Sequence, residues 1–205
     1  MFKRVSLLGC LALCLSGCIS PVDAATLPIP TVEYSADRTI ETSQGTFEGK
    51  IYATKDKERT ETTMQGMQSV MILRRDQQLG WMIMPAQRMY QKLDYKQAQQ
   101  RSGSQPNDVE ITEVGNDTVE GVAATKYKMI MKDGSAGGFL WITADGITVK
   151  MDMLSKDGRD KNRTTVTLRN LVIGPQDAAL FDPPAGYQAM PSFGGGFGGK
   201  GLFNR

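Results

Sequence analysis

The pattern of apolar and polar positions along the chain predicts a protein built almost entirely of antiparallel strands. The clearest stretch covers residues 119–154, where alternating runs are joined at Asp133-Gly134 and at Asp145-Gly146. An Asp-Gly pair between alternating apolar residues is a strong hairpin signal, because glycine accepts the positive φ that such turns need. We therefore expect three strands here, with side chains two residues apart on the same face.

Strands of similar length precede and follow this stretch. The pattern predicts a first meander with strands at 31–42, 46–54, 58–64, 67–74, 79–84 and 88–93. A second meander begins at 110–118, and residues 162–173 form its last long strand. Residues 95–101 are the only good helix-forming stretch, and 176–180 allow one helical turn. The short helix and the polar residues after it form either a surface connection or a lid over an open sheet.

The two ends of the chain depart from the strand pattern. Residues 1–17 combine a basic start with an apolar run shorter than the roughly 20 residues that span a bilayer, which predicts a signal peptide. Residues 18–30 read as a proline-rich tether. Residues 31–190 form one β-domain, and residues 191–205 a disordered tail rich in glycine and phenylalanine. The phenylalanines of the tail are either contacts for a partner or part of a plain flexible segment.

The cysteines give two readings of how the chain is processed. Leu15-Ser16-Gly17-Cys18 resembles the lipobox of bacterial lipoproteins, which implies that Cys18 becomes the acylated first residue. With a serine at position 20, that family implies the periplasmic side of the outer membrane, held there by N-terminal acyl chains. Val22-Asp23-Ala24 instead fits ordinary signal peptidase, with cleavage before Ala25 and a soluble periplasmic product. Both readings place the protein in the cell envelope.

Composition excludes most catalytic chemistry. The chain has no histidine, and its cysteines all lie within the first 18 residues, so Cys-His and Ser-His nucleophiles and histidine-based zinc sites are excluded. Removing Lys3 and Arg4 with the signal leaves 22 basic against 22 acidic residues, a poor balance for binding nucleic acid. The carboxylate pairs Asp56/Glu58, Glu110/Glu113 and Asp157/Asp160 lie in polar surroundings typical of a solvated surface. We expect no enzyme and no cofactor.

A repeated Met-x-Met pattern is the most suggestive candidate site. The pairs are Met82/Met84, Met129/Met131 and Met151/Met153. Each pair lies on one face of its strand, and the flexible thioether suits a surface that accepts variable apolar shapes. We expect these residues to line a cavity that binds an acyl chain, with Trp81, Tyr90 and Trp141 near its rim. Two alternatives remain: the methionines fill an ordinary core, or their thioethers bind Cu(I).

The order of features resembles the superfamily of LolA/LolB-like periplasmic lipoprotein carriers, and within it a family of envelope domains of unknown function. The resemblance rests on residues 31–37 (TVEYSAD), 81–93 (WMIMPAQRMYQKL), 119–122 with 126–128, 141–150 and 180–187 (LFDPPAGY). It implies a mainly β fold, a curved antiparallel sheet or half-open β-barrel of roughly 9–11 strands with one or two short helices. The best-known members hold acyl chains in the concave face, and the family implies no catalytic residues.

The sequence therefore predicts a non-enzymatic envelope protein that binds a lipid or another apolar small molecule in the concave face of a half-open barrel. The main alternative is a structural or protein-interaction lipoprotein with a filled core that engages another envelope protein. Methionine-based copper binding is the third. A continuous apolar pocket favours the first hypothesis, and a solid core with an exposed apolar patch favours the second.

Overall fold

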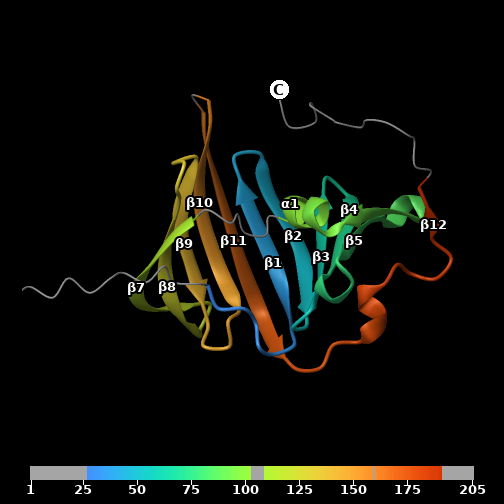
Figure 1. Cartoon of the computed structure of the whole chain (residues 1–205), viewed down its shortest axis with the longest axis horizontal. Helices are drawn as coiled ribbons and strands as arrows, with labels where there is room; N and C mark the ends of the chain where they lie inside the picture. Colours follow the sequence, from blue (N-terminus) through green and yellow to red (C-terminus); the bar gives the residue numbers. More distant parts are fainter. Residues whose placement is uncertain (1–26, 103–108, 159, 191–205) are drawn as a thin grey trace, which may run out of the picture.

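In the computed structural model, which describes residues 27–102, 109–158 and 160–190, twelve strands form a single curved sheet (Figure 1). Along the sheet their order is β12-β6-β5-β4-β3-β2-β1-β11-β10-β9-β8-β7. The strands are β1 (Tyr34–Thr42), β2 (Gly45–Ala53), β3 (Lys57–Met64), β4 (Met67–Arg74), β5 (Leu79–Met84), β6 (Met89–Asp94), β7 (Val109–Val119), β8 (Val122–Met131), β9 (Ala136–Ile142), β10 (Thr148–Asp157), β11 (Asp160–Ile173) and β12 (Gln188–Ala189). The predicted fold class, an open antiparallel sheet with few and short helices, is confirmed.

Two meanders make up this sheet, and the ends of the domain join them. Strands β1 to β6 follow one another in space as in sequence, and so do β7 to β11. The first strand then pairs antiparallel with the last long strand, from Tyr34↔Ile173 to Glu41↔Thr165. Figure 1 shows β1 (blue) beside β11 (orange-brown), although the two lie far apart in the sequence. The two-residue β12 adds a parallel pairing at the outer edge of β6.

The predicted hairpin turns are confirmed at the positions of their glycines. In the β3–β4 turn, Gln65 and Gly66 both have positive φ, 50° and 79°, the combination that a two-residue type I′ turn requires. At the β8–β9 turn Gly134 has a φ of 69°, and its N–H donates to the carbonyl of Met131 at 2.8 Å. Such turns fix the register of the strands that they join, and therefore which side chains share a face.

Helical structure in the described chain is short and peripheral. The helix α1 (Tyr95–Ser102) follows β6, as predicted, and three single 3₁₀ turns are η1 (Arg75–Gln77), η2 (Pro85–Gln87) and η3 (Ala178–Phe181). Ala98 of α1 is fully buried against Leu73 and Leu93. On the opposite face of the sheet, Phe181 of η3 is fully buried in a cluster with Val70 and Ile83. Both faces of the β4–β6 end are therefore covered.

A buried arginine fixes the segment that follows β11. Arg74, at the end of β4, donates to Asp76 at 2.7 Å and to Asp182 at 2.9 Å. Its own side chain is only 9% exposed. This pairing attaches the residues after η3 to the sheet, and Met190 then donates its backbone N–H to the carbonyl of Tyr90.

The predicted signal peptide and most of the predicted tether, together with the predicted disordered tail, lie outside the described residues. Within the described ranges, no helix is both long enough and apolar enough to cross a bilayer.

Candidate functional site

The first predicted methionine pair lies on the side of the sheet that α1 covers. Directly opposed residues of neighbouring antiparallel strands share a face. Met82 lies opposite Met71, and this row continues across the sheet through Thr60 and Ile51 to Ala36 on β1. Met84, two residues after Met82, points to the same side. This side is also where Met71 and Met82 pack against the cluster that contains Ala98 of α1.

The other two pairs lie on the same side, at the far end of the sheet. Met129 lies opposite Gly138, which in turn lies opposite Met153. Met151 lies opposite Val166, and Val166 opposite Ile40 on β1. Ile40 is four residues after Ala36 on a strand that pairs with β2 without interruption, so the two rows share one face.

The three Met-x-Met pairs, predicted separately, therefore lie on one face of one sheet. We call this the methionine face. Its members include Tyr34, Ala36, Arg38, Ile40, Ile51, Ala53, Met71, Met82, Met84, Met129, Met131, Leu140, Met151, Met153 and Leu168. Their binding role stays a prediction, because the register establishes a shared face and not a ligand.

Each end of the methionine face is partly covered by the chain itself. At the β7–β10 end Met129 is 5% exposed, and it packs in a cluster with Leu27 and Ile111, against which Met151 and Met153 are half-buried. At the β4–β6 end the face is covered by α1, whose Ala98 packs in a cluster with Leu73 and Leu93. Among the three Met-x-Met pairs, the methionines with the most accessible surface are therefore the half-buried ones, not Met129.

Two glycines leave gaps among the side chains of the methionine face. A Cβ on Gly138, between Met129 and Met153, would overlap the backbone carbonyl of Asp152 on the neighbouring strand. A Cβ on Gly49, directly opposite Arg38, would overlap the carbonyl of Glu61 in the same way. Only glycine fits where backbones approach this closely, so these positions cannot be filled by larger side chains without moving a strand.

The three aromatic residues expected near the rim of the methionine cavity lie on the opposite face. Trp81 directly precedes Met82 on β5, and neighbours on a strand point to opposite sides. Tyr90 lies opposite Ile83, the other neighbour of Met82. Trp141 lies opposite Lys150, which directly precedes Met151. The prediction for these aromatics is corrected by strand alternation, which for Trp81 was already visible in the sequence.

On that opposite face the two tryptophans have structural partners. Trp81 packs in the cluster around Phe181. Trp141 is 6% exposed, and its indole Nε1 donates to Asp117 Oδ2 at 2.8 Å. That hydrogen bond is the main cause that lowers the pKa of the Asp117 carboxyl below its ordinary value. The ammonium groups of Lys126 and Lys150 lie 4.9 and 5.0 Å from the centre of the Trp141 ring, a cation–π distance.

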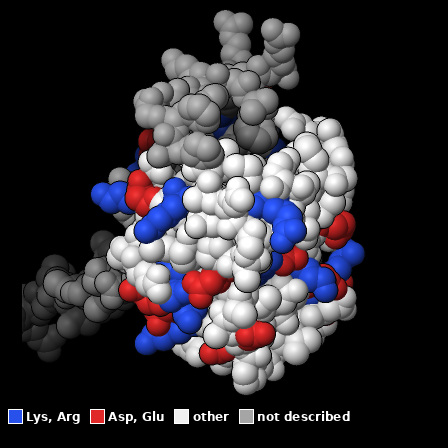
Figure 2. All heavy atoms as spheres, turned by 90° about the vertical axis from the view of Figure 1, so that its right-hand side faces the viewer, with Lys and Arg blue, Asp and Glu red and all other residues white. Residues whose placement is uncertain are grey.

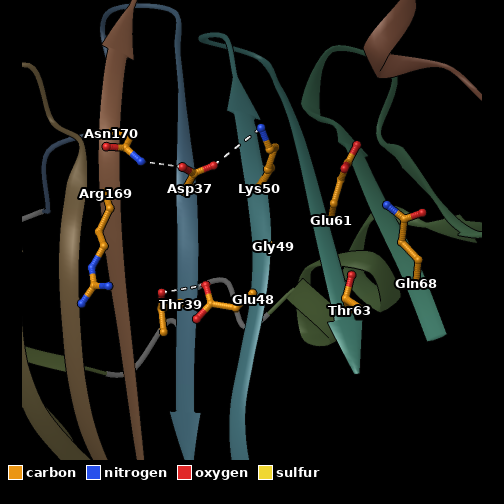
Figure 3. Close-up of a pocket in the computed structure, with 10 residues that line it drawn as sticks. All are labelled: Asp37, Thr39, Glu48, Gly49, Lys50, Glu61, Thr63, Gln68, Arg169 and Asn170. Carbon is orange, nitrogen blue, oxygen red and sulfur yellow. Dashed lines mark hydrogen bonds and ion pairs between the residues drawn. The ribbon is translucent and has the colours of Figure 1, made fainter. Parts of the chain in front are cut away.

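Two hollows of the described chain also lie on the face opposite the methionines. One of them has a volume of about 510 Å³ and lies over β11, β1, β2, β3 and β4; Figure 3 shows its lining residues, with α1 behind the strands. Several of its polar groups pair with one another: Asn170 donates to Asp37 at 2.7 Å, Lys50 lies 3.6 Å from Asp37, and the hydroxyl of Thr39 donates to Glu48 at 3.0 Å. The Asn170 hydrogen bond is the main cause that lowers the pKa of Asp37. This hollow is open and internally paired, and it offers no apolar wall for an acyl chain.

One charged residue of the methionine face was missed by the sequence reasoning. Arg38 lies two residues from Ala36 and two from Ile40 on β1, so its side chain points to the same face as theirs. Burial lowers the pKa of the Arg38 guanidinium, and the charge of Glu58 and the nearby Tyr34 oppose that effect. Burial likewise raises the pKa of the Tyr34 phenol well above its ordinary value. The spacing of two residues between Arg38 and its apolar neighbours was the sequence signal that could have placed Arg38 on this face.

Apart from Glu58, the remaining sequence-based candidates are surface features or lie outside the described residues. Cys18, the predicted lipidation site, is among the latter. Asp56, Glu110, Glu113 and Asp160 are exposed. Glu58 was expected on a solvated surface, but it is half-buried opposite Ala53 on the methionine face and pairs with Arg75 at 3.7 Å. Within the described ranges no three His, Cys, Asp or Glu side chains gather as a metal site would require. On the side of the molecule that Figure 2 shows, basic and acidic side chains alternate over an otherwise uncharged surface, so that side presents no broad positive field of the kind that attracts nucleic acid.

Comparisons with known proteins identify a family and a shared fold. The family model described as Domain of unknown function (DUF4412) matches residues 37–169. Among solved structures, an uncharacterized conserved protein from Thermus thermophilus is 11% identical with a TM-score of 0.56, over 78% of this chain and 90% of that chain. At this identity the likeness shows the fold alone. No curated protein matches the sequence significantly.

More distant similarities connect the chain to two named systems. The lipoprotein LppX of Mycobacterium tuberculosis is 11% identical with a TM-score of 0.39, over 67% of this chain and 85% of that chain. The structure of the MucA/MucB complex of Pseudomonas aeruginosa is 16% identical with a TM-score of 0.39, over 72% of this chain and 54% of that chain. This chain thus spans about half the length of that matched structure. Scores this low carry no argument about function.

Proposed function

The chain belongs to the family described as Domain of unknown function (DUF4412), and for this member we propose a non-enzymatic binding role in the cell envelope. The ligand is a lipid, an acyl chain or another apolar small molecule, held against the methionine face. The single observation that carries the proposal is the register that places all three Met-x-Met pairs, and Met71 as well, on one face of one curved sheet.

The methionine face offers an apolar ligand adaptable side chains and a place in which to bury its apolar surface. Thioether side chains are flexible and polarisable, so they adapt to ligands of variable shape. Each methylene of the ligand that leaves water contributes roughly 0.8 kcal/mol. Thr60, which interrupts the apolar row across the middle strands, is itself buried. A long apolar chain therefore finds a lining made mostly of apolar side chains between β5 and β8.

The proposed setting follows from the N-terminal segment of the chain. The lipobox-like residues up to Cys18 support attachment to the periplasmic side of the outer membrane, and cleavage before Ala25 is the alternative. Membership of the LolA/LolB-like superfamily is part of the same proposal, supported by the half-open sheet, by the resemblance in sequence and by the position of α1 between the two meanders. In this proposal α1 covers one end of the methionine face, so access to the ligand is from the remaining, uncovered part.

A filled core is the second candidate, and a specific observation favours it. Met129 is 5% exposed, and Ala36 and Ala53 in the middle of the same face are 5% and 3% exposed. If the chain fills this face by itself, the sheet serves as a scaffold and the partner is another envelope protein. In that case the edge strand β7, where Val114 is 55% exposed, is the available surface.

Mass spectrometry of the organic extract tests the proposal, using protein purified from its own membrane. The double variant Met151→Gln/Met153→Gln changes two half-buried residues of the methionine face. Met190→Gln, at a residue 38% exposed and outside this face, is the matched control. We expect wild type and control to carry apolar ligand and the double variant to lose it while its thermal unfolding stays cooperative.

Two results would contradict the proposal. An apolar extract that is empty for folded wild-type protein favours the filled core. Equal ligand content in the double variant and the wild type means that the ligand lies elsewhere. Copper measured in the same wild-type samples, without lipid, would support the thioether site formed around Gly138 by Met129, Met151 and Met153.

A further inference from the structure

Arg38 introduces a positive charge into an otherwise apolar part of the methionine face. Its neighbours along β1 on that face are Ala36 and Ile40, and across the sheet Leu168 lies directly opposite on β11. On its other side stands Gly49, which has no side chain to cover the guanidinium. The charge therefore lies mid-sheet, with the methionines of β4 and β5 on one side and those of β8 and β10 on the other.

The guanidinium of Arg38 differs from its buried counterparts in having no ion pair. Every other arginine of the described chain whose side chain is buried or half-buried pairs with a carboxylate: Arg59 with Glu61 at 2.7 Å, Arg74 with Asp76 at 2.7 Å and Arg75 with Glu58 at 3.7 Å. For Arg38 the described residues provide neither a hydrogen bond nor a salt bridge. Glu58, the acidic group that acts on it electrostatically, is the partner of Arg75.

We propose that Arg38 binds the anionic head group, a carboxylate or a phosphate, of an amphiphile whose apolar chain lies along the methionine face. This inference rests on the proposed function and specifies its ligand class. It requires no covalent step. The guanidinium binds the head group in the middle of the face, and the apolar chain extends from there over the methionines on one side.

Physical chemistry favours an anion at this position. A cation removed from water without a partner is costly, and a buried charge is normally paired or hydrogen-bonded. The planar guanidinium presents a rigid fork of N–H donors that matches a carboxylate or phosphate in a bidentate arrangement. Burial lowers the pKa of Arg38, because the guanidinium has lost part of its hydration in the folded protein. Less hydration therefore remains to be removed when a ligand binds. The ligand's anion then supplies the missing pair, in a place where water competes weakly.

The test compares two ligands that share an apolar chain and differ in charge. Palmitate carries a carboxylate, and 1-hexadecanol has the same chain length without charge. Binding of each to delipidated full-length protein is measured at neutral pH by competition with a fluorescent fatty acid. For wild type we expect palmitate to bind about 10 to 100 times more tightly than 1-hexadecanol, the range expected of hydrogen bonds to charged groups.

The variant Arg38→Met removes the charge and keeps an apolar side chain of similar length. We expect it to lose this preference, with weaker binding of palmitate and unchanged or tighter binding of 1-hexadecanol. The matched control is Arg88→Met, which makes the same change at an exposed arginine in a turn and should preserve the preference. A third ligand, 1-palmitoylglycerol 3-phosphate, distinguishes a phosphate from a carboxylate as the favoured head group.

The possible outcomes separate the failure of this inference from that of the proposed function. If wild type binds neither palmitate nor 1-hexadecanol, the proposed function fails. If wild type binds 1-hexadecanol as tightly as palmitate, the role of Arg38 is refuted and apolar binding stands, and this result needs no variant. If Arg38→Met weakens both ligands equally, Arg38 acts through structure only, which also overturns the inference.

Discussion

The contact between α1 and the methionine face predicts a large effect from one added methyl group, in the variant Gly80→Ala. Gly80 lies on β5 directly beneath α1. A Cβ built there lies 2.5 Å from the Cβ of Ala98 and 2.8 Å from the backbone carbonyl oxygen of Ile72. Carbon atoms in contact are normally about 3.5–4.0 Å apart, so α1 must move away from the sheet by about 1 Å.

The cost follows from how tightly this contact is packed. Ala98, Leu73 and Leu93 are 0%, 1% and 2% exposed, so no free space exists into which the new methyl group can relax. Overpacking of a closed contact costs about 1–3 kcal/mol. For a domain of this size each kcal/mol lowers Tm by about 2–4 °C, so we expect a Tm lower by roughly 2–12 °C.

Thermal unfolding followed by circular dichroism measures this change, and hydrogen exchange shows whether α1 is the part that loosens. Gly174→Ala is the matched control, because a Cβ there meets nothing within 4 Å and its φ is not in the positive region. The control should be neutral or slightly stabilising, since alanine restricts the unfolded chain. If Gly80→Ala unfolds at the wild-type temperature, α1 does not pack on β5 as described, and its role as a cover of the methionine face is refuted.

Three further variants test other parts of the structure. Arg74→Met should lower the free energy of unfolding by about 2–4 kcal/mol, because it breaks a buried arginine pairing; denaturant unfolding measures this, and an unchanged stability would contradict the attachment of the segment after η3. Trp141→Phe should raise the pKa of Asp117, followed by NMR titration of its carboxyl carbon, because the indole donor that lowers this pKa is lost. Since the folded-state pKa is lowered, the stabilisation from that hydrogen bond exists above the unfolded value and is lost as pH falls through the folded value, so the difference in stability between wild type and variant should be larger at neutral pH than in acid. Cys18→Ala should move the protein out of the membrane fraction or leave an uncleaved precursor, whereas an unmodified N-terminal Ala25 on the wild type would rule out the lipoprotein.

Local sequence was sufficient to predict the long strands and their turns. It did not predict the two-residue β12, which brings the described sheet to twelve strands instead of the roughly 9–11 expected. Asp133-Gly134 and Gln65-Gly66 mark hairpins because the required positive φ is a property of the turn itself. Alternation likewise determined that each methionine pair shares one face, and it placed Trp81 on the face opposite Met82, an implication that our prediction of an aromatic rim overlooked.

Properties that depend on several strands at once were not available from local sequence. That Met82 and Met151 share a face depends on the registers of all the strands between them and on the pairing of β1 with β11, a contact between the two ends of the domain. Whether Arg38 finds a carboxylate depends on where Glu58 and Arg75 lie in three dimensions. The Gly80–Ala98 contact is tertiary in the same sense, because neither residue is distinctive in its own segment.

The central claim is that an apolar ligand lies on the methionine face, and NMR of methyl-labelled methionine tests it most directly. The protein is produced with ¹³C-methyl-labelled methionine, delipidated and titrated with 1-hexadecanol, and signals are assigned by single substitution. We expect shifts at half-buried methionines of the face, among them Met71, Met82, Met84, Met131, Met151 and Met153, and none at Met190, which lies outside it. Saturable shifts confined to Met190, or no shifts at all, would contradict the claim.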